Sequence, residues 1–348
     1  MKKGIRLAVL AAVSSLALAA AGSAFAVYTP TLAISPGNLS TGAAGAQTIK
    51  FTSSAADDAT SKITIYTPLG YTVNLGQAVG AKIGKVNAQI IAVALGGALL
   101  PLSGDIVVDD PAKYTAAAAS VACAGAAAHN AVWLLNLSVA GQTLAVPVYV
   151  DKTAGAEATF ASMKLQTCLS SPNATIAQGG NSVGAKAVSV DFTFNGVLTN
   201  PATAGDNTWR ALFTPWVTNS GTAVNAAGTI ESRSIVRLPA ALTLAAGAGG
   251  KLTGSLAENH IGIGGTKVEI WGGTSAKKLA KLGTVKTKGA GDFSYAGKKG
   301  LTYQAKVALG SRGNTTSGCA GVSPFAPVPC ATATIGGWTT SSAVVKAK

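Results

Sequence analysis

The stretch Leu252–Val307 constrains the fold of this chain more than any other part of the sequence. Apolar and polar residues alternate along it, so that Val268 and Ile270 flank the charged Glu269. Successive side chains of a β-strand point to opposite faces, and this alternation therefore predicts strands with one buried and one solvated face. Glycine-rich turns separate the segments, as in antiparallel β-sandwiches. The expected fold class is all-β, built from antiparallel β-sandwich units.

A set of short motifs follows Gly254 within this stretch. They are Gly265–Trp271 (GTKVEIW), Leu282–Thr287 (LGTVKT), Gly291–Tyr295 (GDFSY) and Tyr303–Val307 (YQAKV). The pattern resembles the Ig-like modules of bacterial secreted and surface proteins called carboxypeptidase-regulatory-like or transthyretin-like. The resemblance implies an immunoglobulin-like sandwich that acts as a spacer, adhesive or positioning module. Such modules often have an Asp before the glycine turn, where this chain has Lys288, so no role is transferred to that position.

The first residues have the composition of a secretory signal. Three basic residues in the first six positions precede the apolar run Leu7–Ala21, and Ala24–Ala26 has the small-residue form of a cleavage site. We therefore expect residues 1–26 to be a cleaved signal helix and the mature protein to be secreted, extracellular or held in the cell envelope. No membrane span is expected in the mature chain, because the apolar stretch Val86–Leu102 is short and interrupted by glycine and proline.

Charge divides the chain into two parts. The whole chain has a net charge of +14, from 27 Lys and Arg against 13 Asp and Glu. Residues 27–239 have 11 basic and 10 acidic side chains, net +1, whereas residues 240–348 have 13 basic and 3 acidic ones, net +10. Pro239 stands at the change in composition. We therefore expect an N-terminal β-sandwich region over 27–239 and a basic Ig-like module over 240–348.

The clearest hairpin in the N-terminal region consists of Val132–Val139 and Gln142–Val150. Ala140–Gly141 joins the two arms, and glycine there supplies the positive φ that tight hairpin turns need. Pro147 in the second arm predicts an edge strand or a bulge, because proline cannot donate to a strand ladder. The alanine run Ala116–Ala119 is short and soon followed by a glycine, so we expect it to lie in a loop.

Three strands are expected in the second half of the N-terminal region. They are Ala187–Phe194, Thr208–Trp216 and Ile230–Leu238, each with alternating or apolar side chains. Two arrangements fit them equally well. Either 27–170 is a complete sandwich and 186–239 a separate small sheet, or the three strands extend the first sandwich.

The four cysteines fit an oxidising compartment. Cys319 and Cys330 bracket a short proline-rich loop, which suggests a local disulfide and leaves Cys123 to pair with Cys168. Four cysteines allow three pairings, and spacing alone does not choose among them. A zinc site is not expected, because the chain has no C-x-x-C motif and only two histidines. No metal and no cofactor is predicted.

Possible catalytic residues are sparse. His129 and His260 lie outside any known motif, and Ser275-Ala-Lys-Lys278 matches the S-x-x-K pattern without its partner motifs. The acidic pairs Asp57-Asp58 and Asp109-Asp110 could bind a hard cation, but Asp is also common in turns at strand ends. We assign no catalytic residue.

Lysines of the C-terminal module are the strongest functional signal. Strand alternation is expected to place several of them on the solvated face of one sheet. The candidate ligand-binding residues are Lys277, Lys278, Lys281, Lys286, Lys288, Lys298, Lys299 and Lys306. Lysines also keep proteins soluble and protect edge strands, so this enrichment has a purely structural explanation as well. Nucleic acid is not expected as a partner, because arginine is scarce and no aromatic residues are expected among the lysines.

The sequence favours a non-enzymatic secreted or cell-envelope protein with a structural or binding role. Its basic module would serve as a spacer, or as an anchor to an anionic surface polymer or to another surface protein. The alternative is an extracellular hydrolase or carbohydrate-active enzyme with a site in the N-terminal loops, around the Asp pairs and His129. An enzyme should have a cleft in which carboxylates and His129 converge.

Overall fold

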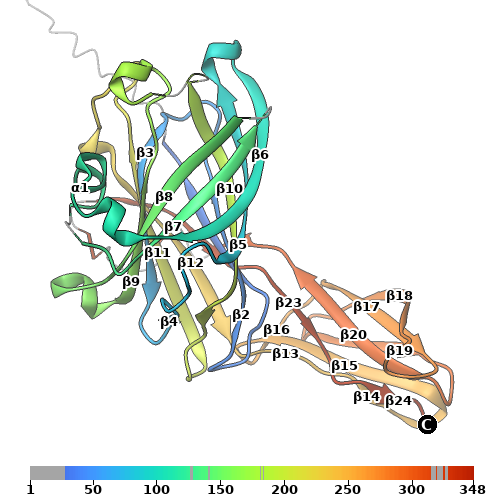
Figure 1. The fold of residues 1–348 in the computed structure, drawn as a ribbon. Coiled ribbons are helices and arrows are strands. Elements are labelled where there is room, and N and C mark those ends of the chain that lie inside the picture. The colour runs from blue at the N-terminus through green and yellow to red at the C-terminus, as the bar shows by residue number, and fades with distance from the viewer. Residues whose placement is uncertain are drawn as a thin grey trace, which may run out of the picture.

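The computed structural model describes residues 28–125, 128–139, 142–180, 182, 184–314, 319, 324–325 and 328–348. Apart from one seven-residue helix and a few 3-10 turns, its regular elements are β-strands, almost all antiparallel, which confirms the all-β class. Figure 1 shows a large unit that contains the N-terminal strands and a narrower unit that ends at the C-terminus. The expected signal segment, 1–26, lies outside the described residues. No helix in the described part is long and apolar enough to cross a membrane.

The large unit is one continuous 14-stranded sheet. In spatial order its strands are β1 (Thr31–Pro36), β2 (Ala44–Thr52), β10 (Ala185–Thr199), β5 (Lys82–Ala92), β6 (Ala98–Asp109), β7 (Ala131–Val139), β8 (Gln142–Lys152), β9 (Ala161–Cys168), β3 (Thr60–Pro68), β11 (Gly205–Pro215), β12 (Ile230–Leu238), β22 (Cys330–Ile335) and β21 (Arg312–Gly313), with β4 (Thr72–Val73) beside β10. The sheet curves around a single apolar core, so that its opposite walls face each other as the layers of a sandwich do (Figure 1).

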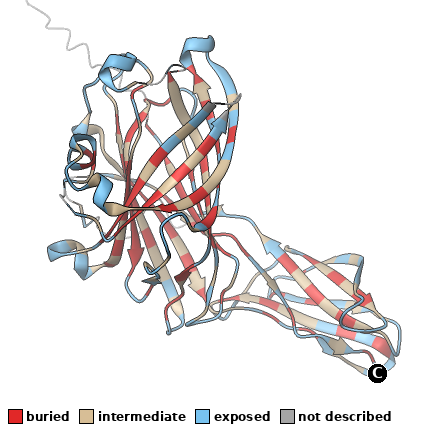
Figure 2. Ribbon diagram, viewed as in Figure 1, coloured by how far each residue is buried: buried red, intermediate tan, exposed pale blue. Residues whose placement is uncertain are grey.

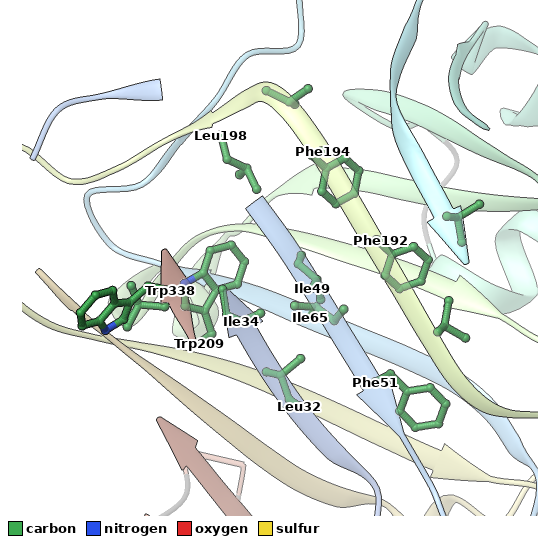
Figure 3. Packing of buried hydrophobic residues seen from close by; sticks show 14 of the residues in the cluster. Leu32, Ile34, Ile49, Phe51, Ile65, Phe192, Phe194, Leu198, Trp209 and Trp338 are labelled. Carbon is green, nitrogen blue, oxygen red and sulfur yellow. The ribbon is translucent and has the colours of Figure 1, made fainter. Parts of the chain in front are cut away.

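Aromatic and β-branched side chains fill this core. Phe51 of β2 stacks on Phe213 of β11 at 5.1 Å between ring centres, and Trp133 of β7 contacts Phe194 of β10 at 4.9 Å. Figure 3 shows the side chains of β1, β2 and β10 packed together on the inner side of the sheet. Burial of these side chains is the main stabilising contribution to the unit.

The free edge of β1 closes the sheet against β12. Leu32 N–H donates to Ser232 Oγ and Ile34 N–H donates to Ser234 Oγ, each at 2.9 Å. All four residues are fully buried. Buried backbone N–H groups need a hydrogen-bond partner, and here side-chain hydroxyls take the place of a neighbouring strand.

Strand β22 adds contacts to the same free edge of β1. Thr332 Oγ1 donates to the Pro30 carbonyl at 3.2 Å, and Thr334 Oγ1 donates to the Leu32 carbonyl at 2.5 Å. Because the hydroxyl residues alternate along β12 and β22, they point to the same side and match the repeat of β1. We call Ser232, Ser234, Thr332 and Thr334 the hydroxyl seam.

The small unit is a sandwich of two sheets. One contains β13 (Ala240–Leu242), β14 (Ala245–Ala246), β15 (Lys251–Glu258), β16 (Ile261–Gly262) and β19 (Asp292–Ala296), and the other contains β17 (Lys267–Gly273), β18 (Ala280–Lys286), β20 (Thr302–Leu309), β23 (Trp338–Ser341) and β24 (Val345–Lys346). Val268, Ile270 and Tyr303 are buried between the sheets, as the alternation predicts. Figure 2 shows the same alternation of buried and exposed residues along the strands.

In the part of the chain that the structure describes, the backbone crosses between the two units three times. After β20 it returns to the large sheet as β21 and β22, and β22 lies parallel to β12. The chain then goes back to the small unit at Gly336, where a Cβ would overlap the Ile34 carbonyl oxygen. Residues 240–348 therefore form the small sandwich together with two strands of the large sheet, rather than a single continuous module.

The structure decides between the two arrangements of the later N-terminal strands. Strand β10 lies between β2 and β5, and β11 lies between β3 and β12, so these strands are part of the first sheet. The expected loop after Ala116 is wrong in part: Ala118–Ala124 forms helix α1, which ends at Gly125 in the left-handed conformation. The predicted hairpin is present as β7 and β8, while its turn, 140–141, lies outside the described residues.

Candidate functional site

On the outer surface of the sheet that contains β17, β18 and β20, several lysine side chains lie near the aromatic ring of Trp271. Strand register places Lys286 opposite Lys267, Lys306 opposite Glu269, and Lys281 opposite Trp271. Paired residues share a face of the sheet, so these side chains all lie on the solvated side. We call Lys267, Glu269, Trp271, Lys281, Lys286 and Lys306 the basic face.

Trp271 is held at the centre of the basic face by polar contacts. The Lys306 ammonium lies over its ring, 4.1 Å from the ring centre, and the indole N–H donates to Glu269 Oε2 at 3.1 Å. Lys281 forms an ion pair with the other oxygen of Glu269. Hydrogen bonds from Lys281 and Trp271 hold the pKa of the Glu269 carboxyl below its usual value. The ring is therefore fixed in place and stays half-exposed, with the Lys306 ammonium over its face.

A cavity of about 780 Å³ opens where the basic face meets the large unit. Lys267, Lys281 and Lys306 line it from the small unit, and the turn Gly37–Ser40 between β1 and β2 lines it from the large one. The cavity therefore extends the basic face into a hollow between the two units. A ligand there would contact both.

The predicted lysines fall into three groups. Lys281, Lys286 and Lys306 lie on the basic face, while Lys288 lies in the turn between β18 and β19. The remaining four predicted lysines occupy loops at the end of the small unit farthest from the large one (Figure 1). They are Lys277, Lys278, Lys298 and Lys299.

Sequence reasoning missed Lys267 and Trp271. Each lies two residues from Glu269 along the same strand. The alternation that predicted the strand therefore already placed their side chains on the solvated face. The expectation that no aromatic residue lies among the lysines is therefore wrong, because Trp271 is in direct contact with Lys306.

The acidic pairs have structural roles. Asp57 accepts from the N–H groups of Thr29 and Ser54, at 3.1 and 3.0 Å. Asp110 caps the 3-10 turn Pro111–Tyr114 by accepting from Ala112 N–H, as turn-forming Asp residues do. Among the described residues no group of three or more His, Cys, Asp or Glu side chains is arranged to hold a metal ion.

The S-x-x-K match and His260 also lie in turns. Lys278 N–H donates to the Ser275 carbonyl at 3.0 Å, which places that motif in a turn between β17 and β18. His260 has a φ of 66° and stands at the tip of the turn between β15 and β16.

His129 belongs to a buried chain of three polar side chains. Ser120 Oγ lies 2.9 Å from His129 Nε2, and His129 Nδ1 lies 2.9 Å from Asp151 Oδ2. Asn130 N–H donates to the second Asp151 oxygen at 3.1 Å. The order of groups is that of a serine hydrolase triad, in which histidine takes the serine proton and aspartate orients the ring. Ser120 was not predicted, because α1 was expected to be a loop.

The burial of this chain opposes a catalytic role. Ser120 and the His129 side chain have no exposed surface, and His129 stacks on Tyr149 at 4.5 Å. Helix α1 presents Ala119 and Ala122 to a nearby cavity of about 370 Å³, and Ser120 is absent from its lining. A nucleophile must reach its substrate, and this hydroxyl faces the protein interior.

We expect Ser120→Ala to lower the free energy of unfolding by about 1–2 kcal/mol, because it leaves a buried histidine nitrogen without its partner. Chemical denaturation measures this loss. Hydrolysis of p-nitrophenyl acetate should be the same for wild type and Ser120→Ala. Ester hydrolysis that disappears in Ser120→Ala, while the variant remains folded by circular dichroism, would contradict the structural role.

Both suggested disulfides are present. Cys123 at the end of α1 is bonded to Cys168 at the end of β9, and Cys319 is bonded to Cys330 at the start of β22. The first fixes α1 on the outside of the large sheet, and the second closes the loop before β22.

Comparisons with known proteins add no assignment to this geometry. No protein-family model matches the chain, and no curated protein matches it significantly.

Proposed function

We propose that this protein is a non-enzymatic binding protein of the cell envelope or extracellular space, and that it binds an anionic envelope polymer on the basic face. The single observation that carries the proposal is the arrangement of four lysines around the half-exposed Trp271, beside a cavity between the units. The predicted signal segment and the two disulfides support an oxidising, secreted location.

Charge density favours a polymeric anion over a single small one. Four lysines and one glutamate occupy neighbouring positions on three adjacent strands. Exposed lysines of this kind bind weakly one by one, because water and salt screen each contact. A polymer with repeated negative charges contacts several of these lysines at once. Its overall affinity is then much higher than that of any single contact.

Trp271 gives the face a feature that simple solubility does not require. Lysines alone keep a surface hydrated, but an aromatic ring fixed among them exposes apolar surface at a defined position. A sugar or polyol backbone between charged groups can pack on such a ring while the charges reach the lysines. We therefore infer an anionic polysaccharide or polyol phosphate as the class of ligand.

A second candidate function is ester or glycoside hydrolysis in the N-terminal region. The order Ser120, His129 and Asp151 favours it, and their burial opposes it. The binding proposal agrees better with the exposure of the residues involved.

Polygalacturonate is a suitable anionic probe, with dextran as its neutral counterpart. We expect wild type to bind polygalacturonate and not dextran, and Trp271→Ala to weaken this binding by about tenfold, because both the stacking surface and the position of Lys306 are lost. Isothermal titration measures the affinities. The matched control is Trp216→Ala, a tryptophan outside the basic face at the end of β11. Equal loss in both variants, or binding of dextran, would contradict the proposal.

A further inference from the structure

The large unit contains a second, quite different cavity inside the curved sheet. It has a volume of about 190 Å³, and its lining includes Ile90, Leu102, Leu137 and Phe192. None of the described residues that line it is charged. An apolar cavity of about 150 Å³ is large enough to hold benzene, so this one has room for a slightly larger molecule.

A gap between β8 and β9 lets the cavity reach the outside. These strands pair only from Tyr149 to Lys152, so among the described residues the first part of β8, up to Val148, is not paired with β9. Leu144–Pro147 of β8 and Cys168–Ser170, at the end of β9 and just after it, line the cavity on either side of the gap. Pro147 fits this position, because it has no N–H to pair with β9.

One polar atom at the inner end of the cavity lacks a hydrogen-bond partner. Thr167 is 5% exposed, and its hydroxyl is buried without a partner. Thr167 lines this cavity and also a smaller, deeper space of about 20 Å³ that continues it into the core. Burying a hydroxyl without a partner is unfavourable, and a ligand carrying a donor or acceptor would supply the missing hydrogen bond.

The segments around the opening carry few charges and expose apolar side chains. Lys186 lies between the lining residues Ala185 and Ala187, and its ammonium donates to the Ala55 carbonyl at 2.8 Å. Residues 86–104, 130–150 and 165–185 contain no Asp, Glu, Lys or Arg. The hairpin tip between β5 and β6 exposes apolar side chains, with Val93 44%, Leu95 57% and Leu99 56% exposed. Val93 N–H donates to the Gly184 carbonyl. This hydrogen bond places the hairpin tip next to the start of β10, where Ala185 lines the cavity.

From these observations we infer that the large unit binds a small neutral apolar molecule, about the size of one ring with a short substituent, whose single hydroxyl or carbonyl group hydrogen-bonds Thr167. The absence of charge in the lining excludes a carboxylate or ammonium at the inner end, since burying an unpaired charge is too costly. The site lies at the end of the large unit away from the small one, so it is independent of polymer binding on the basic face.

The test compares p-cresol with toluene, which differ by one hydroxyl. Ligand-observed NMR titration of the full chain should show that p-cresol binds about fivefold to tenfold more tightly than toluene. Thr167→Val keeps the side-chain shape and should abolish this preference while toluene still binds. Thr193→Val is the matched control, because its hydroxyl bonds Thr48 on the outer side of the same sheet.

Two variants that fill the cavity complete the test. Ala88→Leu fills the buried wall and Ala187→Leu fills the half-buried opening, so at least one should remain folded and lose binding of both probes. Absence of binding of either probe to wild type would overturn the inference. Binding unchanged in both filled variants would place the probes elsewhere, and a preference for p-cresol that survives Thr167→Val would overturn the role of the hydroxyl.

Discussion

Replacing Ser232 and Ser234 together by alanine should lower the free energy of unfolding by about 2–6 kcal/mol. Each serine hydroxyl accepts from a fully buried N–H of β1, and alanine leaves those N–H groups of Leu32 and Ile34 without any partner. Water cannot replace the hydroxyls, because the seam lies within the packed contact of β1 with β12. A buried donor without an acceptor costs about 1–3 kcal/mol, and the two costs should add approximately.

Urea denaturation followed by tryptophan fluorescence measures this effect. The matched control is the double variant Ser103→Ala and Ser138→Ala, two exposed serines that face each other on β6 and β7. Surface substitutions of this kind change stability by no more than about 0.5 kcal/mol. If the seam variant were as stable as this control, the side-chain closure of the sheet would be refuted.

Arg312→Ala is expected to destabilise the junction between the two units by about 3 kcal/mol. Glu258 at the end of β15 is buried, and it accepts from Arg312 of β21 and, at 2.5 Å, from the indole N–H of Trp338. Removing Arg312 leaves a buried carboxylate with a single donor. The loss should fall at the lower end of the range for buried ion pairs, because the Arg312 side chain is 35% exposed.

The control for the junction is Lys50→Ala, which breaks the exposed ion pair between Lys50 and Asp191. Exposed pairs contribute about 0–1 kcal/mol, so this variant should stay close to wild type in the same denaturation experiment. Faster hydrogen exchange of the Trp338 indole in Arg312→Ala would locate the loss at the junction. Equal stability of the two variants would mean that the buried pair does not hold the units together.

Local alternation predicted those parts of the fold that depend on neighbouring residues. The small unit is the best example, since burial of Val268, Ile270 and Tyr303 follows from the period of two alone. The disulfide between Cys319 and Cys330 was suggested by its short loop in the same way. The seven-residue helix α1 was missed because a run this short has too few turns to show a helical period.

The remaining features depend on contacts between distant residues. Strand β22 pairs with β12, about a hundred residues earlier in the chain, and nothing in either segment specifies the other. The hydroxyl seam looks like ordinary polar alternation until β1 is placed beside it. Trp271 differs from these cases. Its place on the same face as Glu269 followed from the sequence, and only its contacts with Lys306 and Glu269 had to come from the structure.

Salt dependence of polyanion binding tests the proposed function most directly. The key variant replaces the four lysines of the basic face by glutamine, and the matched control replaces four exposed lysines of the large unit, namely Lys50, Lys82, Lys85 and Lys152. Both variants have the same net charge. Titration with polygalacturonate across a sodium chloride series should give wild type and control the same affinity and the same steep loss with salt, and the basic-face variant little binding at any salt. Equal binding by both variants, or wild-type affinity that salt does not change, would contradict the account.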